Sequence, residues 1–96
     1  MRRAAKVDRN HSEIVEAFRK FGCSVLPLHT VGGGCPDIAV GLRKKTILVE
    51  IKDGSKPKSA QGLTKDEQRF HEVWQGSLVV VMDLGDVIAL VKALEN

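Results

Sequence analysis

The sequence predicts an α/β domain with a mixed sheet, and three observations carry that prediction. Apolar residues recur at helical spacing in two segments, residues 10–21 and 64–75. Two apolar, β-branched runs, residues 37–42 and 46–52, flank a basic tripeptide as the arms of an antiparallel hairpin do. A further apolar run, residues 78–82, is typical of a buried central strand. The resulting order, αβββαβα, predicts a mixed central sheet flanked by helices.

The first helical segment carries its own start and stop signals. Asn10 stands at the N-cap position, and Glu13 three residues later completes the pattern of a capping box. Gly22 marks the end of the helix, because glycine readily adopts the left-handed backbone that follows a last turn. Residues 24–28 include a proline and are expected to form at best an edge strand, and the glycine-rich residues 31–36 to form a loop.

The hairpin prediction fixes a register between its two strands. If residues 43–45 form a three-residue turn, the numbers of paired residues sum to about 88, which sets Asp37 opposite Ile51. Residues 53–62 are rich in lysine, serine and glycine and are expected to form a loop. Residues 87–94 fit either a helix or a strand, and we favour a short helix.

The second helical segment is predicted to begin with a capping box formed by Thr64 and Glu67 and to run to about Gln75. Its apolar stripe is expected to pack on the core, and it consists of Leu63, Phe70, Val73 and Trp74.

Length and composition restrict the classes of protein to consider. The chain has 96 residues, room for one domain over residues 1–96, with residues 1–9 expected to form a flexible arm. Its net charge of +3 favours a polyanionic partner only weakly. The two cysteines are too few for a disulfide scaffold and are expected to be reduced thiols. Neither a signal peptide nor a membrane-spanning run is recognisable, so we expect a cytoplasmic protein.

Two carboxylates and one ammonium are expected to converge at one rim of the sheet. Side chains alternate along a strand, so Glu50 and Lys52 share the face opposite the core. On the partner strand, Asp37 falls on the same side at the end near Glu50. Such a group suits Mg²⁺, which takes oxygen ligands from one or two carboxylates, and the backbone carbonyl of Ile51 could add a third oxygen. Lys52 would then orient the attacking water or stabilise the transition state of hydrolysis.

The alternative interpretation of these residues is a solvated pair on an exposed strand, because Glu-x-Lys is a common tripeptide. The combination of all three residues with a glycine-rich, proline-ended loop favours the metal site over that alternative.

These residues also carry a resemblance to a known family. Pro36-Asp37 followed by Glu50-Ile51-Lys52 at the end of an apolar strand resembles the PD-(D/E)XK nuclease motif. With the helical Glu13-Ile14-Val15, the glycine-rich residues 31–36 and the segment 63–68, the chain resembles the stand-alone, phage-type VRR-NUC (virus-type replication-repair nuclease) domains. The resemblance extends over residues 7–82 and implies a restriction-endonuclease-like αβββαβ core.

The resemblance implies roles for individual residues. Asp37 and Glu50 match the metal-binding acids, Lys52 matches the catalytic lysine and Ile51 supplies a backbone carbonyl. A glutamate of the first helix usually joins the site in this family. Helical geometry favours Glu13 over Glu16 for that place, because Glu13 lies at the border of the apolar stripe, but Glu13 could instead serve the capping box.

The family's glutamine in the second helix matches Gln68, although helical geometry turns Gln68 away from the apolar stripe, as for an ordinary solvent-facing residue.

The basic residues could contact DNA phosphates or be solvated surface. The six candidates for phosphate contact are Arg43, Lys44 and Lys45 at the hairpin turn and Lys56, Lys58 and Lys65 on or near the following loop. No Gly-Lys-Ser/Thr follows the three glycines, so a nucleotide-binding P-loop is excluded and no nucleotide cofactor is expected. The glycines either let the backbone approach DNA or form the turn into Asp37.

The resemblance implies an endonuclease that depends on Mg²⁺ or Mn²⁺, acts on branched DNA such as four-way (Holliday) junctions and forms a homodimer. It also implies a phage or prophage setting in a bacterial host. One alternative is a non-catalytic nucleic-acid-binding protein on the same fold. A second is a sequence-specific restriction-type endonuclease, for which the chain has little room for a base-reading insertion.

Overall fold

The computed structural model describes residues 10–57 and 62–96, and the α/β prediction is confirmed. The expected arm of residues 1–9 and the loop residues 58–61 lie outside this description. The helices and strands follow one another in the predicted order: α1 (His11–Lys20), β1 (Ser24–Pro27), β2 (Ile38–Leu42), β3 (Lys45–Ile51), α2 (Lys65–Val73), β4 (Leu78–Val81) and α3 (Leu84–Glu95). None of the helices within the described ranges has the length and apolar character needed to cross a bilayer.

The four strands form one mixed sheet in the order β1-β2-β3-β4. Strands β1, β2 and β3 pair antiparallel, and β4 pairs parallel to β3. The prediction of an edge strand for β1 is confirmed, but the prediction of a central strand for residues 78–82 is wrong. Strand β4 lies at the other edge of the sheet, because the chain continues from it into α3 and the described residues contain no further strand.

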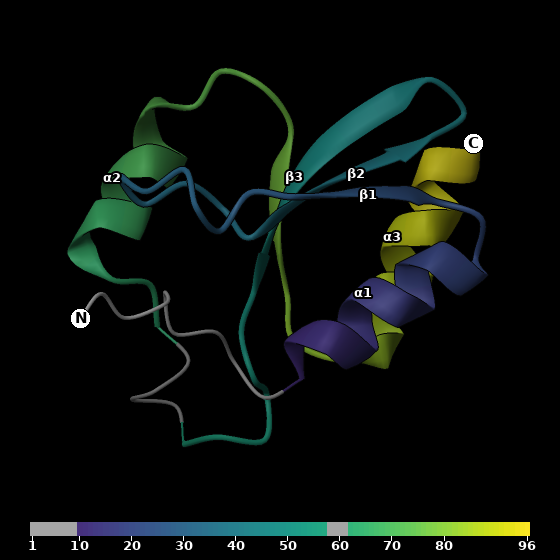
Figure 1. The fold of residues 1–96 in the computed structure, drawn as a ribbon, viewed down its shortest axis with the longest axis horizontal. Coiled ribbons are helices and arrows are strands. Elements are labelled where there is room, and N and C mark those ends of the chain that lie inside the picture. Colours follow the sequence, from purple (N-terminus) through teal and green to yellow (C-terminus); the bar gives the residue numbers. More distant parts are fainter. Residues whose placement is uncertain (1–9, 58–61) are drawn as a thin grey trace.

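Helices α1 and α3 lie side by side against one face of the sheet (Figure 1). Their apolar side chains and those of the strands form the core, which includes Ile14 and Phe18 of α1, Val87 and Val91 of α3, and Ile38, Val40, Val49, Ile51 and Val81 of the sheet. The predicted core faces of the hairpin strands are therefore confirmed for their most buried residues. The helix favoured for residues 87–94 is also confirmed, and it begins earlier, at Leu84, behind the N-cap Asp83.

Helix α1 begins after Asn10 as predicted, but the capping box predicted for Asn10 and Glu13 is wrong. The Asn10 side chain makes no capping hydrogen bond. Its amide nitrogen donates instead to the backbone carbonyls of Lys52, at 3.2 Å, and Met82, at 2.9 Å. Asn10 thereby ties the start of α1 to the ends of β3 and β4. The predicted stop at Gly22 is confirmed by a left-handed φ of 91°.

The hairpin has a two-residue turn in place of the predicted three-residue turn. Arg43 and Lys44 both have positive φ, 52° and 69°, as in the primed turns whose twist matches that of the strands. Lys45 therefore belongs to β3 and pairs with Leu42, and the register differs from the prediction by one residue. Continued past the last pair, this register sets Asp37 opposite Glu50 rather than Ile51, which brings the two acids closer than expected.

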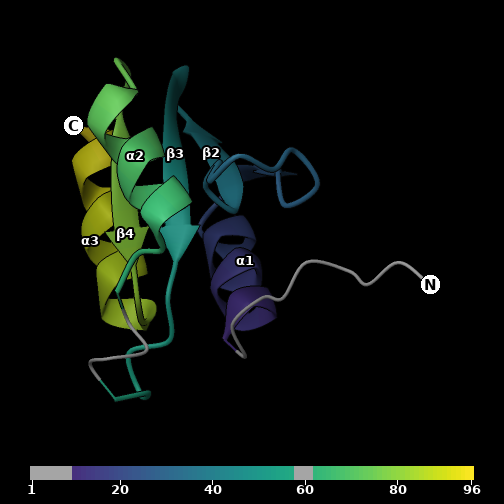
Figure 2. The same cartoon turned by 90° about the vertical axis from the view of Figure 1, so that its left-hand side faces the viewer.

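Helix α2 lies apart from α1 and α3, beside the glycine-rich loop (Figure 1), and in the turned view it stands in front of β3 and β4 (Figure 2). The Thr64–Glu67 capping box is confirmed. The expected packing of its apolar stripe on the core is wrong, because α2 has no buried residue and the Val73 side chain is 62% exposed. The rings of Phe70 and Trp74 stack on each other at 5.4 Å instead.

The glycine-rich loop anchors α2 through a close backbone approach. Gly34 has a φ of 80°, and a Cβ atom there would lie 2.2 Å from the backbone oxygen of Asp66. Only glycine fits this contact. The first turn of α2 is therefore placed by the loop that leads into Asp37, so two segments far apart in the sequence meet beside the sheet.

Candidate active site

Asp37, Glu50 and Lys52 come together at the end of the β2–β3 hairpin that is distant from its turn. Asp37 immediately precedes β2, Glu50 is the penultimate residue of β3, and Lys52 directly follows β3. Glu50 and Lys52 project from the face of the sheet that α1 and α3 leave uncovered, because the alternate residues Val49 and Ile51 belong to the core.

The carboxylate of Asp37 takes the place of a missing strand partner. Continued pairing beyond Ile38 would set Pro36 opposite Ile51, and a proline has no N–H to donate to the Ile51 carbonyl. The ladder stops at Ile38, and the Ile51 N–H donates instead to Oδ2 of Asp37 at 2.7 Å. Since the N–H and C=O of a strand residue point to the same side, the Ile51 carbonyl faces the side on which Asp37 lies. This direction fits its expected role as an oxygen ligand.

Glu50 is a buried acid without enough hydrogen-bond donors. It is 2% exposed, and its Oε1 atom has no hydrogen-bond partner among the described residues. Burial raises the pKa of Glu50 to about 9, and the adjacent Asp37 carboxylate, followed by Glu67, adds to the rise against the opposing effect of Lys52. Two adjacent acids with an orphaned buried oxygen are the arrangement that a divalent cation stabilises. The residues present thus fit Mg²⁺ or Mn²⁺.

The fit is that of a magnesium site with few protein ligands. Over residues 10–57 and 62–96, no group of three or more His, Cys, Asp or Glu side chains is arranged to hold a metal ion. Mg²⁺ is commonly held by only one or two carboxylates, with water and phosphate oxygens completing its shell. Asp37, Glu50 and the Ile51 carbonyl meet that requirement.

Lys52 is held between two glutamates. Its Nζ atom lies 2.9 Å from Oε1 of Glu67 and 3.9 Å from Oε2 of Glu50. The same Oε1 of Glu67 accepts the backbone N–H of Thr64 at 2.9 Å, as part of the capping box of α2. Burial favours a raised pKa for Glu67, but the hydrogen bonds from Lys52 and Thr64 outweigh it and lower the pKa below its ordinary value.

Glu67 is the site residue that sequence reasoning missed. The sequence assigns Glu67 to the cap of α2 and Gln68 to the site, whereas the structure places Glu67 on Lys52 and leaves Gln68 exposed. One signal could have found it. The N3 side chain of a capping box turns back toward the N-terminus of its helix, and here that end faces β3.

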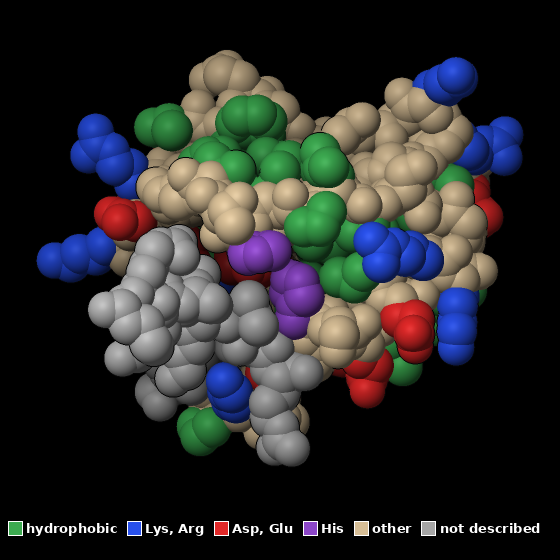
Figure 3. Space-filling model, viewed as in Figure 1, with side chains coloured by type: hydrophobic (Ala, Val, Ile, Leu, Met, Phe, Trp, Pro, Cys, Tyr) green, Lys and Arg blue, Asp and Glu red, His purple; other side chains and the backbone are tan. Residues whose placement is uncertain are grey.

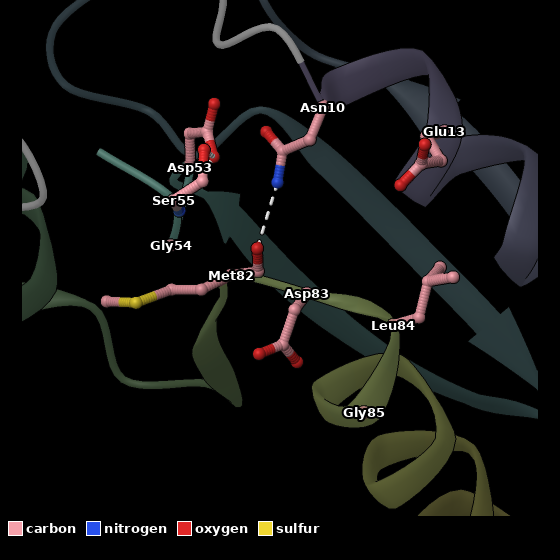
Figure 4. A pocket seen from close by; sticks show the side chains of 9 residues that line it. All are labelled: Asn10, Glu13, Asp53, Gly54, Ser55, Met82, Asp83, Leu84 and Gly85. Carbon is pink, nitrogen blue, oxygen red and sulfur yellow. Dashed lines mark hydrogen bonds between the residues drawn. The ribbon is translucent and has the colours of Figure 1, made fainter.

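The structure does not bring a glutamate of α1 to the acids of the sheet. Glu13 is exposed and lines a separate open groove of about 800 Å³ together with Asp53 and Asp83 (Figure 4). Glu16 is also exposed and lies along a different, more apolar groove with Phe21. The charged neighbours of Glu50 are instead Asp37, Glu67 and Lys52.

The larger groove is a poorer candidate than the sheet rim, although the largest groove is the usual first choice for a site. Two of its acids already have structural roles. Oδ1 of Asp53 accepts both the N–H and the hydroxyl of Ser55, and Oδ1 of Asp83 caps α3 by accepting the N–H of Asp86. We therefore keep the rim beside Asp37 and Glu50 as the candidate site.

On the face drawn in Figure 3, the Lys and Arg side chains of the described residues lie in several separate places rather than in one patch. Arg43 and Lys44 are exposed at the hairpin turn, which lies roughly 20 Å from Glu50 along β3 at about 3.3 Å per residue. The ammonium of Lys45 is used structurally, because it donates to the last carbonyls of α3, those of Leu94 at 3.0 Å and Asn96.

The structure describes two of the three remaining candidates. Lys65 is exposed at the first turn of α2, Lys56 is half-buried in the loop after β3, and Lys58 lies outside the described residues. Phosphate contact by these residues stays a prediction.

Both cysteines are free, as expected. Cys35 lies beside the two acids, and burial followed by the charges of Glu50 and Asp37 raises the pKa of its thiol. A thiol in such surroundings is a poor nucleophile, so Cys35 adds no reactive group to the site.

Comparison of the chain with protein-family models, with curated proteins and with solved structures finds no match in any of the three.

Proposed function

We propose that this protein is a divalent-metal-dependent DNA endonuclease of the PD-(D/E)XK type, similar to the VRR-NUC domains. The observation that carries the proposal is the buried carboxyl group of Glu50, which has one oxygen without a hydrogen-bond partner in the described part of the chain, lies beside Asp37 and has the Lys52 ammonium 3.9 Å away. A structural ion pair does not need a second acid beside it, since that acid only raises the cost of ionising the first.

The protein's own groups have distinct parts in this proposal. Asp37, Glu50 and the Ile51 carbonyl would hold Mg²⁺ or Mn²⁺. When bound, the cation would lower the pKa of a water molecule and neutralise charge on the phosphodiester. Lys52 would hold that water or the scissile phosphate by hydrogen bonding and would stabilise negative charge as it develops. The limited exposure of the Lys52 side chain, 12%, strengthens its electrostatic effect.

The substrate and setting follow from the resemblance and are proposals too. We expect branched DNA, such as a four-way junction, to be cut in preference to a linear duplex, and we expect the protein to act in the cytoplasm of a bacterial host. Arg43 and Lys44 at the hairpin turn and Lys65 on α2 would contact phosphates at some distance from the scissile bond.

The test is a cleavage assay with a labelled four-way junction, a matched linear duplex and supercoiled plasmid in Mg²⁺, Mn²⁺ or EDTA. Lys52→Ala should lower the cleavage rate by at least about a hundredfold and leave junction binding nearly unchanged. Lys92→Ala is the matched control, since Lys92 is an exposed lysine on α3. Salt-sensitive DNA binding without cleavage by the wild type in either metal would instead support the non-catalytic binding protein.

Strand β4 offers a place for the proposed homodimer. The backbone N–H groups of Leu48 and Lys52 donate to the carbonyl oxygens of Ser77 and Val81. The alternate residues Leu78 and Val80 therefore direct their own N–H and C=O groups away from β3, to the open edge. Residues 76–82 carry no charge, whereas the other edge strand, β1, ends at Pro27. An uncharged, unblocked edge is suited to antiparallel pairing with the same strand of a second copy.

Val80→Pro tests this interface, because it removes an N–H that points away from β3 and leaves the β3–β4 hydrogen bonds in place. We expect a monomer in sedimentation equilibrium for the variant and a dimer for the wild type. A dimer with Pro at position 80 would show that the second copy binds elsewhere.

A further inference from the structure

We propose that Glu67 is a positioning residue that holds the Lys52 ammonium ready for the reaction and keeps it from pairing with Glu50. The inference deepens the proposed nuclease function and rests on it for its catalytic consequence. The placement of Lys52 itself can be measured independently of any activity.

The two glutamates compete for one ammonium. Nζ of Lys52 lies within hydrogen-bond distance of Glu67, 2.9 Å, but is 3.9 Å from Glu50. A pair at 3.9 Å has attraction without a hydrogen bond. Within residues 10–57 and 62–96, Oε1 of Glu50 has no hydrogen-bond partner even though this cation is nearby. In this arrangement Lys52 bonds to Glu67 and leaves the Glu50 oxygens accessible to a metal ion.

Among the residues that the structure describes, Glu50 is the next acid near the Lys52 ammonium after Glu67. On ionising, Glu50 would attract the ammonium, and a direct Lys52–Glu50 ion pair would occupy the oxygen that the metal ion needs. Loss of Glu67 should therefore weaken metal binding at Glu50 as well as displace the Lys52 ammonium. An ordinary surface ion pair would have neither effect, because it contributes little.

Glu67 is fixed in place from two sides. Its Oε1 atom accepts the Thr64 N–H, and its own N–H donates to the Thr64 hydroxyl at 3.2 Å, so the capping box sets its rotamer. The first turn of α2 is held in turn by the close approach of Gly34 to Asp66. A carboxylate held by backbone contacts can orient a flexible lysine better than a mobile surface glutamate can.

The experiment compares four variants of the full chain. Glu67→Ala removes the acceptor, and Glu67→Gln keeps an amide oxygen that can accept from both Lys52 and Thr64. Thr64→Ala removes the capping hydroxyl but keeps the backbone N–H that bonds to Glu67. Glu72→Ala is the charge control, because Glu72 is an exposed glutamate of the same helix.

The first readout is the ¹⁵N-ammonium NMR signal of Lys52, assigned by its loss in Lys52→Ala, since only an ammonium held in a stable hydrogen bond exchanges slowly enough to be seen. We expect a signal in the wild type, Thr64→Ala and Glu72→Ala, a shifted signal in Glu67→Gln and no signal at the wild-type position in Glu67→Ala. An unchanged Lys52 signal in Glu67→Ala would overturn the proposal.

The second readout is junction cleavage as a function of Mg²⁺ and DNA concentration. Glu67→Ala should lower kcat by about 10- to 100-fold and raise the Mg²⁺ requirement while KM for the junction stays nearly constant, and Glu67→Gln should recover most of kcat. If Thr64→Ala loses as much kcat as Glu67→Ala, Glu67 acts only through the helix cap and the proposal fails. If the wild type cuts no DNA, the nuclease assignment fails, and the NMR comparison still decides whether Glu67 places Lys52.

Discussion

The carboxylate of Asp37 accepts a hydrogen bond of 2.7 Å from the backbone N–H of Ile51, across the point where the β2–β3 ladder ends. One oxygen of Asp37 therefore completes the hydrogen bonding at the end of the sheet. The charge of the same carboxylate contributes to the raised pKa of the adjacent Glu50. The same side chain supports the fold and creates the electrostatic strain that a cation would relieve. These two roles can be separated by substitution.

Asp37→Asn should keep the hydrogen bond and lose the charge, whereas Asp37→Ala should lose both. We expect both variants to lose metal-dependent cleavage. Asp37→Ala should also lower the free energy of unfolding by about 1–3 kcal/mol, since it leaves the Ile51 N–H without its acceptor. Asp37→Asn should be at least as stable as the wild type, because removing the Asp37 charge takes away one cause of the raised pKa of Glu50 and so lowers the cost of ionising it. Urea unfolding in EDTA measures the difference, and equal stability of the two variants would contradict the structural role.

The raised pKa of Glu50 predicts how the stability of the metal-free protein depends on pH. The folded-state pKa of about 9 lies above the ordinary value of 4.5, so between these values the folded protein keeps a proton that the unfolded chain has lost. Stability should therefore fall as pH rises from about 5 to 9, with a slope of at most about 1.4 kcal/mol per pH unit. The lowered pKa of Glu67 acts in a different window, because its contribution is lost only as pH falls below the ordinary range.

Thermal or urea unfolding in EDTA across this pH range tests the prediction, with Glu50→Gln as the variant that should flatten the slope. Added Mg²⁺ should stabilise the wild type more at pH 8 than at pH 6, because a cation competes with the proton for the carboxylate. A wild-type stability in EDTA that stays as constant over this range as that of Glu50→Gln would show that Glu50 is already ionised in its buried position.

The sequence predicts the faces of the hairpin better than its turn. Alternation of apolar residues is a strong signal, and it correctly puts Val49 and Ile51 in the core and Glu50 outside it. No sequence signal predicts the positive φ values of Arg43 and Lys44, because two-residue hairpin turns with positive φ usually contain glycine or asparagine. The predicted register therefore differs by one residue from that of the structure, although the odd and even faces alone exclude Ile51 as the residue opposite Asp37.

The positions of β4 and α2 could not be predicted from the sequence, because they depend on contacts between residues far apart in the chain. The uncharged, apolar residues 78–81 are compatible with a strand at the centre of the sheet and with one at its edge, so composition does not predict that β4 lies at the edge. The bond from Lys52 to Glu67 joins two elements through a loop, and local spacing identifies only the capping role of Glu67. Asp37, Glu50 and Lys52 could be placed together because one hairpin carries all three, whereas α2 is positioned by contacts that leave no periodic pattern.

Lys45 and Lys44 should behave differently although they are neighbours. Lys45→Ala removes the donor that binds the last carbonyls of α3, so we expect a loss of about 1 kcal/mol in unfolding free energy and little change in DNA affinity. Lys44→Ala, at the exposed turn, should leave stability unchanged. If Lys44 contacts a phosphate, its loss should reduce the slope of log affinity against log salt by about 1.

Urea unfolding and salt-dependent junction binding of the two variants make this comparison. A weakened DNA affinity in Lys45→Ala with unchanged stability would reverse the assignment and return Lys45 to the DNA-binding surface.

Gly34 should be the residue on which the placement of α2 depends most. Gly34→Ala puts a Cβ atom 2.2 Å from the backbone oxygen of Asp66, and backbone cannot move aside as a flexible side chain can. Helix α2 must shift, and Glu67 with it, so we expect a loss of stability together with a loss of cleavage. Gly33→Ala is a matched control, since Gly33 also has a positive φ, 65°, but has nothing within 4 Å of its would-be Cβ.

Both alanines carry the left-handed backbone cost of about 1–2 kcal/mol, and only Gly34→Ala adds the collision with α2. The difference between the two variants therefore isolates the contact between the glycine-rich loop and α2. Stability and cleavage should be measured on both, together with the Lys52 ammonium signal. Equal losses in the two variants would mean that the glycines serve only the loop conformation and that α2 is placed by the Lys52–Glu67 hydrogen bond alone.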